Sequence, residues 1–594
     1  MNKILAFDSM YIINPIRKAY MVLIKKMLNA NKTKGNRLIV YRLDHDNLLI
    51  RDKRNVSAIA VGVHKDHIDA MSIKFYKYLG KSRNFNNLLI KNLQLYKLYT
   101  RQVKLKLTGV LICAYRIRQL SIDSEEKIEI LADRQTVAIM KEAFIFLDFK
   151  STNISWNISG LLTACITANS LIMRFAALIK MFITPSNLPK DYFYKHIDSK
   201  APTVLMTMPQ RRADDFFSSY VEEFSNKFNI ILYSMGYWQS IPNDYKRIKI
   251  KRKTGLIRGI FNSNNMCFTL ESYITDILLI FYDHANLSRS IDVVNSIFLN
   301  KIDAHLSRLQ TNVVDNYIAI EAKKRGVFIL GDIMEEVFYC DAAIYPSMSE
   351  NTEPSKLALA HKSNHIYKGS NSLINYRLKN FTKTESHYLH KLLKVDIQKK
   401  IIFYASDPSK DESQRYLNEK FLIDCFSHMK EFILVIKTHP QDNGKITNYA
   451  YLDMKKPSNV ILIGDIVQKN HIISEQFIIF DDFNFNAAVS TCNGFLTFSS
   501  SSILQALVLG VKTGIVDKFS NGNFDYLISH KASMLIDSEE SLKNFLQTKT
   551  FDISDDILSY CGLKNESNEF DVGEYLLKCL RELDKDNEKK KVKS

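Results

Sequence analysis

Two short stretches in the C-terminal third of the chain carry residue types that could bind a phosphate group. One is a run of four serines, and the other is a Lys-x-His-Pro sequence. Hydroxyls and free N–H groups at a helix start bind anions, a lysine adds positive charge, and a histidine can release a proton near neutral pH. Such a set suits the phosphate or diphosphate of a leaving group. The residues are Ser499, Ser500, Ser501 and Ser502 in the first stretch and Lys437, Thr438, His439 and Pro440 in the second.

Each stretch follows an apolar run of the kind that forms a buried parallel strand. Residues 495–498 lead into the serines, and residues 432–436 lead into Lys437. A helical apolar face begins at Ile503, and Gly510 follows it as a stop signal. Because open α/β sheets bind ligands at the carboxyl ends of their strands, we expect both stretches to act on one phosphate. The alternatives are a serine-capped helix without a ligand and a histidine that binds a backbone carbonyl.

The order and spacing of the two motifs resemble the C-terminal half of certain GT-B glycosyltransferases. These are the bacterial sialyl-, polysialyl- and Kdo-transferases and related capsule or O-antigen enzymes, and the resemblance covers residues 396–535. In that family the His-Pro and Ser-Ser motifs hold the nucleotide and phosphate of the donor, often a CMP-sugar. The resemblance implies that His439 contacts the departing phosphate and protonates it. The candidate donor-binding residues are Lys437, His439, Pro440, Ser406, Ser499, Ser500, Ser501, Ser502 and Gln505.

Two departures from the family pattern leave parts of the site open. Gln505 stands where many GT-B enzymes place a glutamate that holds the ribose hydroxyls, so the nucleotide is not fixed. The polysialyltransferase pattern of two acids followed by glycine is also missing. As the catalytic base for the acceptor we expect Glu350 or Glu353, on a loop after the predicted strand 342–345. The competing acids, each of which could instead be a helix cap or a surface charge, are Asp133, Asp214 and Asp332.

The positive charge of the chain is concentrated near its start. The net charge is +18, and residues 1–120 hold 24 Lys and Arg against 6 Asp and Glu, an excess of 24 − 6 = 18. A second basic cluster spans residues 246–253. Such patches predict an anionic partner, which could be a membrane surface, an acidic glycan or nucleic acid. The sequence contains no RNP-type motif or zinc finger, so we expect no nucleic acid.

The sequence shows no pattern typical of a disulfide framework, a metal site or a dinucleotide-binding loop. The eight cysteines form no CxxC pair, which favours a reducing compartment over a disulfide framework. His387 and His390 could share a helix face, but no acidic or cysteine cluster accompanies them, and no Asp-x-Asp metal site is evident. Gly-x-Gly-x-x-Gly and Walker A patterns are missing. We therefore expect neither a cofactor nor a metal.

The alternation of predicted strands and helices places the chain in the α/β class. We expect a GT-B-like fold of two Rossmann-like domains facing a cleft, with an N-terminal α/β extension. The most apolar stretch, residues 160–184, predicts a buried core helix, or secondly an interfacial helix. The expected segments are a basic N-terminal region (1–185), a Rossmann-like acceptor domain (200–385), a nucleotide-sugar-binding domain (396–575) and a basic tail (580–594).

The function that these patterns predict is an inverting, metal-independent glycosyltransferase of bacterial surface polysaccharide synthesis. We expect a nucleotide-sugar donor, favouring a CMP-activated sialic-acid or Kdo-type sugar, and a glycan or lipid-linked acceptor. The enzyme would be cytoplasmic and peripheral at the inner membrane face, bound to anionic lipid through residues 1–120 and 246–253. Alternatives are a UDP- or GDP-sugar donor, a polyol-phosphate transferase, or a non-catalytic protein that binds an anionic glycan or nucleic acid.

Overall fold

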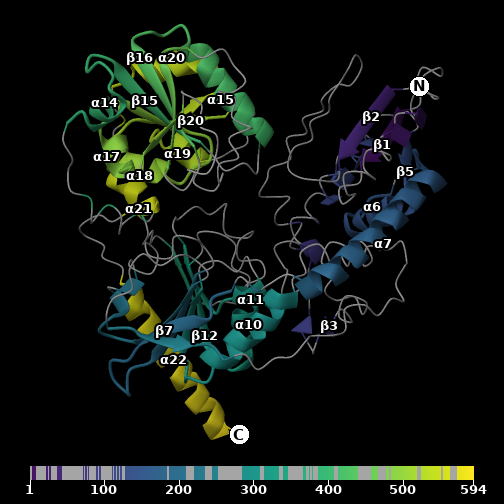
Figure 1. The fold of residues 1–594 in the computed structure, drawn as a ribbon, viewed down its shortest axis with the longest axis vertical. Helices are drawn as coiled ribbons and strands as arrows, with labels where there is room; N and C mark the ends of the chain where they lie inside the picture. The colour runs from purple at the N-terminus through teal and green to yellow at the C-terminus, as the bar shows by residue number, and fades with distance from the viewer. Residues whose placement is uncertain are drawn as a thin grey trace. The chain divides into compact units, whose positions relative to one another are not determined.

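A computed structural model gives the fold of the chain as two compact units (Figure 1). Unit 1 comprises Met1–Ile344, Glu350–Tyr367 and Asp571–Ser594, and unit 2 comprises Tyr345–Ser349 and Lys368–Phe570. The residues that the structure describes are 3–8, 22–23, 26–27, 37–42, 71, 74–76, 78, 89–90, 93–94, 103, 107, 110–111, 113–115, 117–118, 121–122, 128–150, 152–183, 186, 188–208, 220–221, 223–234, 244–251, 284–307, 313–332, 339–345, 365–368, 374, 378, 381, 386–406, 412–438, 457–465, 477–480, 483–517, 524–549, 551, 553–561, 563 and 571–593.

Unit 2 is built on seven parallel strands in the order β18-β17-β16-β15-β19-β20-β21. The chain starts in the middle at β15, adds strands on one side as far as β18, and then continues on the other side with β19. This reversal between β15 and β19 is a topological switch point, where open α/β sheets bind ligands. The strands are β15 (Lys400–Ala405), β16 (Phe432–Lys437), β17 (Val460–Asp465), β18 (Phe477–Phe480), β19 (Gly494–Thr497), β20 (Thr513–Val516) and β21 (Met534–Ile536).

Helices cover both faces of this sheet, which confirms the predicted doubly wound α/β fold. Ile401 and Phe403 of β15 pack into one core with α14, α17, α18, α19 and α21, whereas Ile402 and Tyr404 pack into another with α15 and α20. Burial on both sides explains why the strands are unbroken apolar runs. The helices are α14 (Tyr388–Leu393), α15 (Glu412–Phe426), α17 (Phe485–Ser490), α18 (Ile503–Val508), α19 (Asp525–Ser529), α20 (Glu539–Gln547) and α21 (Asp555–Tyr560).

Unit 1 contains an eight-stranded sheet in the order β10-β7-β9-β8-β11-β12-β13-β14. Its central strands β9, β8, β11, β12 and β13 are parallel, and β7 pairs antiparallel with both β9 and β10. The strands β8 and β9 follow one another in the chain and pair in parallel, as in a β-α-β unit. The elements are β7 (Asp191–Lys195), β8 (Thr203–Met208), β9 (Asn229–Ser234), β10 (Lys246–Lys249), α10 (His284–Ile297), β11 (Ala304–Ser307), α11 (Val313–Lys324), β12 (Phe328–Asp332), β13 (Ala342–Tyr345) and β14 (His365–Lys368).

A separate four-stranded parallel sheet, in the order β2-β1-β5-β6, forms the N-terminal part of unit 1. The strand β5 leads into α6, which crosses to the edge strand β6, and α7 follows. The backbone N–H of Arg134 in α6 donates to Thr163 Oγ1 of α7 over 3.1 Å, which ties the two helices together. The elements are β1 (Lys3–Asp8), β2 (Arg37–Arg42), β5 (Ile128–Ala132), α6 (Arg134–Phe146), β6 (Ile154–Ile158) and α7 (Gly160–Ile183).

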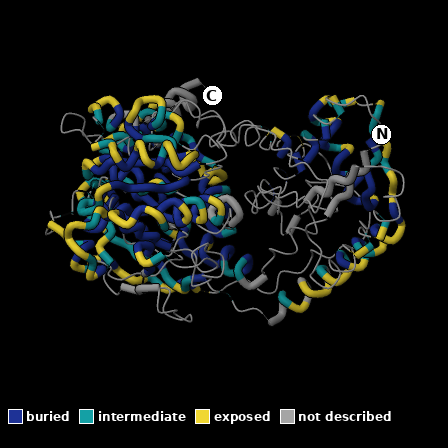
Figure 2. The backbone as a smooth tube through the Cα atoms, turned by 90° about the horizontal axis from the view of Figure 1, so that it is seen from above, coloured by how far each residue is buried: buried dark blue, intermediate teal, exposed yellow. Residues whose placement is uncertain are grey.

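The helix α7 differs from the buried core helix that its apolar sequence predicted. Leu162, Ile166 and Asn169 are buried, but Leu161 and Phe175 on the other side are 62% and 65% exposed. In the backbone coloured by burial, exposed positions run along this long helix (Figure 2). The prediction of a core helix is therefore wrong, because many of the α7 side chains that the structure describes are exposed. Among the residues that the structure describes, no helix is both long and apolar enough to cross a membrane.

The C-terminal helix α22 (Val572–Lys593) returns to unit 1. Lys227 Nζ pairs with Asp571 Oδ2 and, over 3.0 Å, with Glu574 Oε1. The backbone N–H of Val572 donates to Glu223 Oε2 over 3.2 Å. These contacts fix the start of α22 on unit 1, and the helix runs through most of the segment expected as a basic tail.

Candidate functional site

The carboxyl ends of three neighbouring strands of unit 2 are tied together by hydrogen bonds. The backbone N–H of Ser406, just after β15, donates to the carbonyl of Lys437 at the end of β16 over 3.0 Å. On the other side of β15, Thr497 Oγ1 of β19 donates to the carbonyl of Ala405 over 3.0 Å. The sheet thus brings Ser406, Lys437 and the start of the serine turn to one edge, at the switch point.

The serine turn is folded on itself by its own hydroxyls. The backbone N–H of Ser500 donates to Thr497 Oγ1 over 3.1 Å, and Ser500 Oγ lies 2.7 Å from Ser502 Oγ. Ser502 stands at the N-cap of α18 but makes no capping bond with its side chain. Ser499 and Ser501 are exposed, while Ser500 and Ser502 are partly buried. The turn therefore presents a group of hydroxyls to solvent.

The backbone N–H groups that begin α18 are already engaged within the turn. Those of Ile503, Leu504 and Gln505 donate to the carbonyls of residues 500–502, over 3.1 Å in each case. A phosphate at this edge would therefore meet the serine hydroxyls rather than the helix N-terminus that the sequence suggested. Gln505 itself is only 3% exposed.

Lys437 is more deeply placed than a phosphate-binding lysine on a loop would be. Its side chain is 6% exposed, and Nζ donates to the carbonyl of Thr438 over 3.3 Å. The ammonium also lies 5.5 Å from the centre of the Phe483 ring, within the range of a cation–π contact. These contacts hold a positive charge just beneath the edge of the sheet.

A buried carboxylate that the sequence did not single out supports Ser406. Glu419 of α15 is fully buried, and its Oε1 accepts a hydrogen bond from Ser406 Oγ over 2.7 Å. Because a carboxylate in a protein core needs hydrogen-bond donors, this contact fixes the Ser406 hydroxyl in one orientation. Glu419 lies in a helix with several other polar residues, so its sequence context gave no signal of burial.

The remaining predicted site residues fall into two groups. Asp133 is buried at the N-cap of α6 and accepts hydrogen bonds from Thr136 N over 2.9 Å and Thr136 Oγ1 over 2.8 Å, so it serves as a helix cap. Asp332, at the end of β12, is 1% exposed and accepts a hydrogen bond from Tyr220 OH over 2.6 Å. The predictions for His439, Pro440, Glu350, Glu353 and Asp214 lie outside the described residues.

The parallel strands of unit 1 also carry polar side chains, and these are buried. His305 Nε2 of β11 lies 2.9 Å from Thr207 Oγ1 of β8. Burial lowers the pKa of His305 to about 3, so the imidazole is neutral. Burial also raises the pKa of Tyr233 on β9 well above its usual value. These groups sit inside apolar strands, where neither turn residues nor a motif marks them in the sequence.

The described residues contain no group of three or more His, Cys, Asp or Glu side chains that could hold a metal ion. His390, considered above, lies 2.8 Å through Nε2 from the carbonyl of Lys399. A carbonyl can only accept, so Nε2 carries the proton in this contact. The His387 and His390 rings lie edge to face at 5.6 Å between centroids.

Comparisons with known proteins yield weak similarities. No protein-family model and no curated protein matches the chain. The UDP-GlcNAc 2-epimerase from Methanocaldococcus jannaschii, in complex with UDP-GlcNAc and UDP, is 12% identical, with a TM-score of 0.39 over 64% of this chain and 99% of that chain. The UDP-N-acetylglucosamine 2-epimerase from Rickettsia bellii is also 12% identical, with a TM-score of 0.40 over 65% of this chain and 98% of that chain.

WaaG, a glycosyltransferase involved in lipopolysaccharide biosynthesis, is 10% identical, with a TM-score of 0.34 over 58% of this chain and 90% of that chain. At such low scores and identities, these similarities establish neither an activity nor a substrate for this chain. The α/β fold described above follows from the strand order of the two units themselves.

Proposed function

We propose that this protein is a glycosyltransferase of the GT-B type that uses a nucleotide-sugar donor. Unit 2 would bind the donor and unit 1 the acceptor. The donor favoured by the sequence motifs is a CMP-activated sugar of the sialic-acid or Kdo type. The acceptor would be a glycan or a lipid-linked glycan of a bacterial capsule, O-antigen or lipooligosaccharide, and the reaction would invert the sugar without a metal.

The observation that carries this proposal is the set of hydroxyls and charge at the switch point of unit 2. Ser406, Lys437 and the serine turn converge there through the hydrogen bonds between β15, β16 and β19. The Lys-x-His-Pro motif continues directly from β16, so His439 follows the buried Lys437 by two residues. A nucleotide phosphate at this edge would find the hydroxyls of the serine turn and a positive charge, while the Ser406 hydroxyl donates to Glu419.

The chemistry that these groups would perform is stabilisation of the leaving phosphate. As the bond between the sugar and the phosphate breaks, negative charge grows on the phosphate oxygens, and hydrogen-bond donors aimed there lower the barrier. In the proposal His439 gives its proton to that phosphate, while Glu350 or Glu353 removes the proton of the acceptor hydroxyl. The serine hydroxyls and Lys437 hold the phosphate in place.

A place at the inner face of the bacterial membrane belongs to the same proposal. Residues 1–120 and 246–253 would attract the anionic lipid surface. Lys246 and Lys249 of β10 are exposed, which supports this role, whereas Arg247 forms an ion pair with Asp191. Binding through these residues should weaken steeply as salt is added.

A thermal-shift comparison of CMP, UDP and GDP tests the donor proposal. A nucleotide at about 100 times its Kd stabilises the folded protein by about 2.7 kcal/mol. We expect CMP to raise Tm most, and a Ser500→Ala/Ser502→Ala variant to lose most of that shift. Ser529→Ala, at an exposed serine of α19, serves as the matched control. Equal and negligible shifts with all three nucleotides would favour a non-catalytic binding protein, and a larger shift with UDP or GDP would correct the donor.

A further inference from the structure

One face of α7 is exposed and apolar along most of the helix. Among its described side chains, every exposed one is apolar, and small alanines lie between the large residues. The large residues have exposed fractions between 44% and 65%. We call this surface the α7 stripe, and its large residues are Leu161, Leu171, Ile172, Phe175 and Ile179.

The α7 stripe is too long and continuous to be a chance exposure of single side chains. At about 1.5 Å per residue, the helix from Leu161 to Ile179 measures about 27 Å. Contiguous apolar patches of this kind mark sites where a protein contacts another protein or a membrane. On the opposite side of α7, Leu162 and Ile166 are buried within unit 1. The α7 stripe is therefore the exposed side of a helix whose other side is packed.

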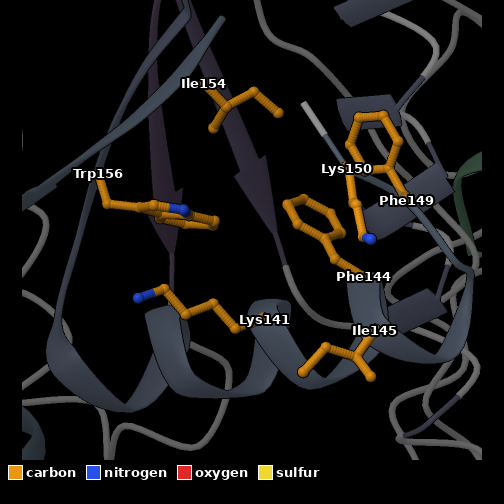
Figure 3. A pocket seen from close by; sticks show the side chains of 7 residues that line it. All are labelled: Lys141, Phe144, Ile145, Phe149, Lys150, Ile154 and Trp156. Atoms are coloured by element: carbon orange, nitrogen blue, oxygen red, sulfur yellow. The ribbon is translucent and has the colours of Figure 1, made fainter. Parts of the chain in front are cut away.

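A second apolar surface lies on the same α6–β6–α7 segment. An open hollow of about 410 Å³ lies between α6 and β6 and is lined by Phe144, Phe149, Ile154 and Trp156, with Lys141 and Lys150 at its edge (Figure 3). The rings of Phe144 and Trp156 are 6.0 Å apart between centroids. Both lysines are exposed. We call this surface the α6–β6 hollow.

We propose that the α7 stripe and the α6–β6 hollow dock this part of unit 1 on an anionic lipid bilayer, with α7 lying in the plane of the interface. This refines the membrane placement put forward under Proposed function. The stripe would enter the boundary between headgroups and acyl chains, Trp156 would sit at headgroup depth, and Lys141 and Lys150 would pair with lipid phosphates.

Charge favours a lipid surface as the occupant. The sequence of α7 contains Arg174 and Lys180 but no Asp or Glu. The same unit includes residues 1–120, which hold an excess of 18 positive charges (24 − 6). An anionic bilayer is complementary to both features, because apolar burial and attraction to its phosphates add.

A second copy of this chain suits the stripe less well. Paired helices use a narrow seam and carry charged residues on its two sides, which set the register. On α7 the positions beside Leu171 and Phe175 are Ile172 and Ala176, which are also exposed and apolar. The described part of this face is therefore wider than a coiled-coil seam, and the only charged residues in the sequence of α7 are basic, as in helices that lie on an anionic membrane.

Sedimentation of the full-length protein with vesicles tests the proposal. Vesicles of phosphatidylcholine with phosphatidylglycerol should bind the protein, and Leu171→Glu/Phe175→Glu should weaken this binding by about tenfold or more, because two side chains lose their apolar contact. Leu299→Glu and Ile397→Glu are matched controls, since these residues are 75% and 58% exposed elsewhere. Binding by the double variant equal to that of the controls would overturn the proposal.

Tryptophan fluorescence locates the contact independently. The chain has two tryptophans, so Trp238→Phe leaves Trp156 as the reporter. In anionic vesicles we expect a blue shift and quenching by lipids brominated on their acyl chains. Unchanged emission with bound vesicles would show that the hollow is not at the interface. High salt should weaken the attraction between the basic residues and the lipid phosphates. The binding that remains comes from apolar contact and should be lost in Leu171→Glu/Phe175→Glu.

Light scattering tests the alternative that a second copy of this chain covers the α7 stripe. A dimer that Leu171→Glu/Phe175→Glu converts to a monomer, with vesicle binding unchanged, would assign the stripe to a second copy and overturn the proposal. The vesicle assays use no nucleotide, and the nucleotide assays use no vesicles. If the protein binds CMP but no vesicles, the donor proposal stands and the docking proposal is overturned. If it binds vesicles but no nucleotide, only the docking proposal stands.

Discussion

The two units both place polar side chains near the carboxyl ends of parallel strands, but they treat them differently. In unit 2 the edge carries Ser499 and Ser501, which are exposed, in a turn whose hydroxyls face solvent. In unit 1 the corresponding region holds Thr207 and Asp332, which are each 1% exposed and hydrogen-bonded to neighbouring side chains. Parallel strand ends thus carry accessible polar side chains in unit 2 and buried, hydrogen-bonded ones in unit 1.

The difference teaches that position in the sheet alone does not identify a ligand site. A strand end offers a site only where a loop turns its polar groups outward, as the serine turn does after β19. In unit 1, Thr207 and Asp332 instead hydrogen-bond to His305 and Tyr220 beneath the surface, where they act on stability.

The largest effect is expected from the loop after β16. His439→Ala should lower kcat by on the order of 10²–10³ with little change in KM, because a donor to the leaving phosphate acts mainly in the transition state. Steady-state kinetics with the CMP-sugar and its acceptor measure this. His530→Ala, at an exposed histidine of α19's C-cap, is the control. Wild-type turnover by a folded His439→Ala protein would rule out the proposed role of His439.

The next effect concerns pH and unit 1. His305 has a pKa of about 3 in the folded protein and an ordinary value of 6.5, so between these values only the unfolded chain binds its proton. Stability from this group is therefore full above pH 6.5 and falls as pH drops, by about 1.4 kcal/mol per pH unit. Urea unfolding of the protein and of His305→Gln between pH 7 and 5 checks the slope.

The variant provides the control for that slope, since glutamine does not titrate while every other histidine remains. We expect the stability of His305→Gln to depend less on pH than that of the wild type across this range. Identical slopes for the two proteins would mean that His305 is accessible and protonated in the folded state. The contrast between the edges of the two units would then fail.

A smaller effect is expected from the residue that supports the edge of unit 2. Glu419→Leu leaves the Ser406 hydroxyl without its acceptor and should lower the free energy of unfolding by about 1–3 kcal/mol. Glu419→Gln keeps an acceptor and should lie between this variant and the wild type. Glu431→Gln, at an exposed glutamate before β16, is the control. CMP affinity should follow the same order. Unchanged stability and CMP affinity in Glu419→Leu would show that Glu419 does not support Ser406 at the edge of the sheet.

Much of unit 2 could be predicted from sequence because its strands are unbroken apolar runs. Runs such as residues 432–436 and 495–498 mark strands that are covered on both faces, and polar residues mark where they end. The short strand β21 was missed, since three residues give too little pattern for a period to be recognised. The meeting of Ser406 with Lys437 followed from parallel topology alone.

The supporting contacts could not be predicted in the same way. Whether a glutamate such as Glu419 or a histidine such as His305 is buried depends on which helix or strand packs against it, and this is set by tertiary structure. The exposed side of α7 shows the same limit, because a largely apolar helix can lie in a core or at a surface with equal local propensity. Its composition favoured the core, and packing decided otherwise.

Hydrogen–deuterium exchange with and without CMP tests the central claim most directly, since it reports where a nucleotide binds in the whole chain. We expect slower exchange in peptides that end β15, β16 and β19, covering Ser406, residues 437–440 and residues 497–505, with little change at the ends of β8, β11 and β12 in unit 1. Protection confined to the unit 1 strand ends, or no protection at saturating CMP, UDP or GDP, would contradict it.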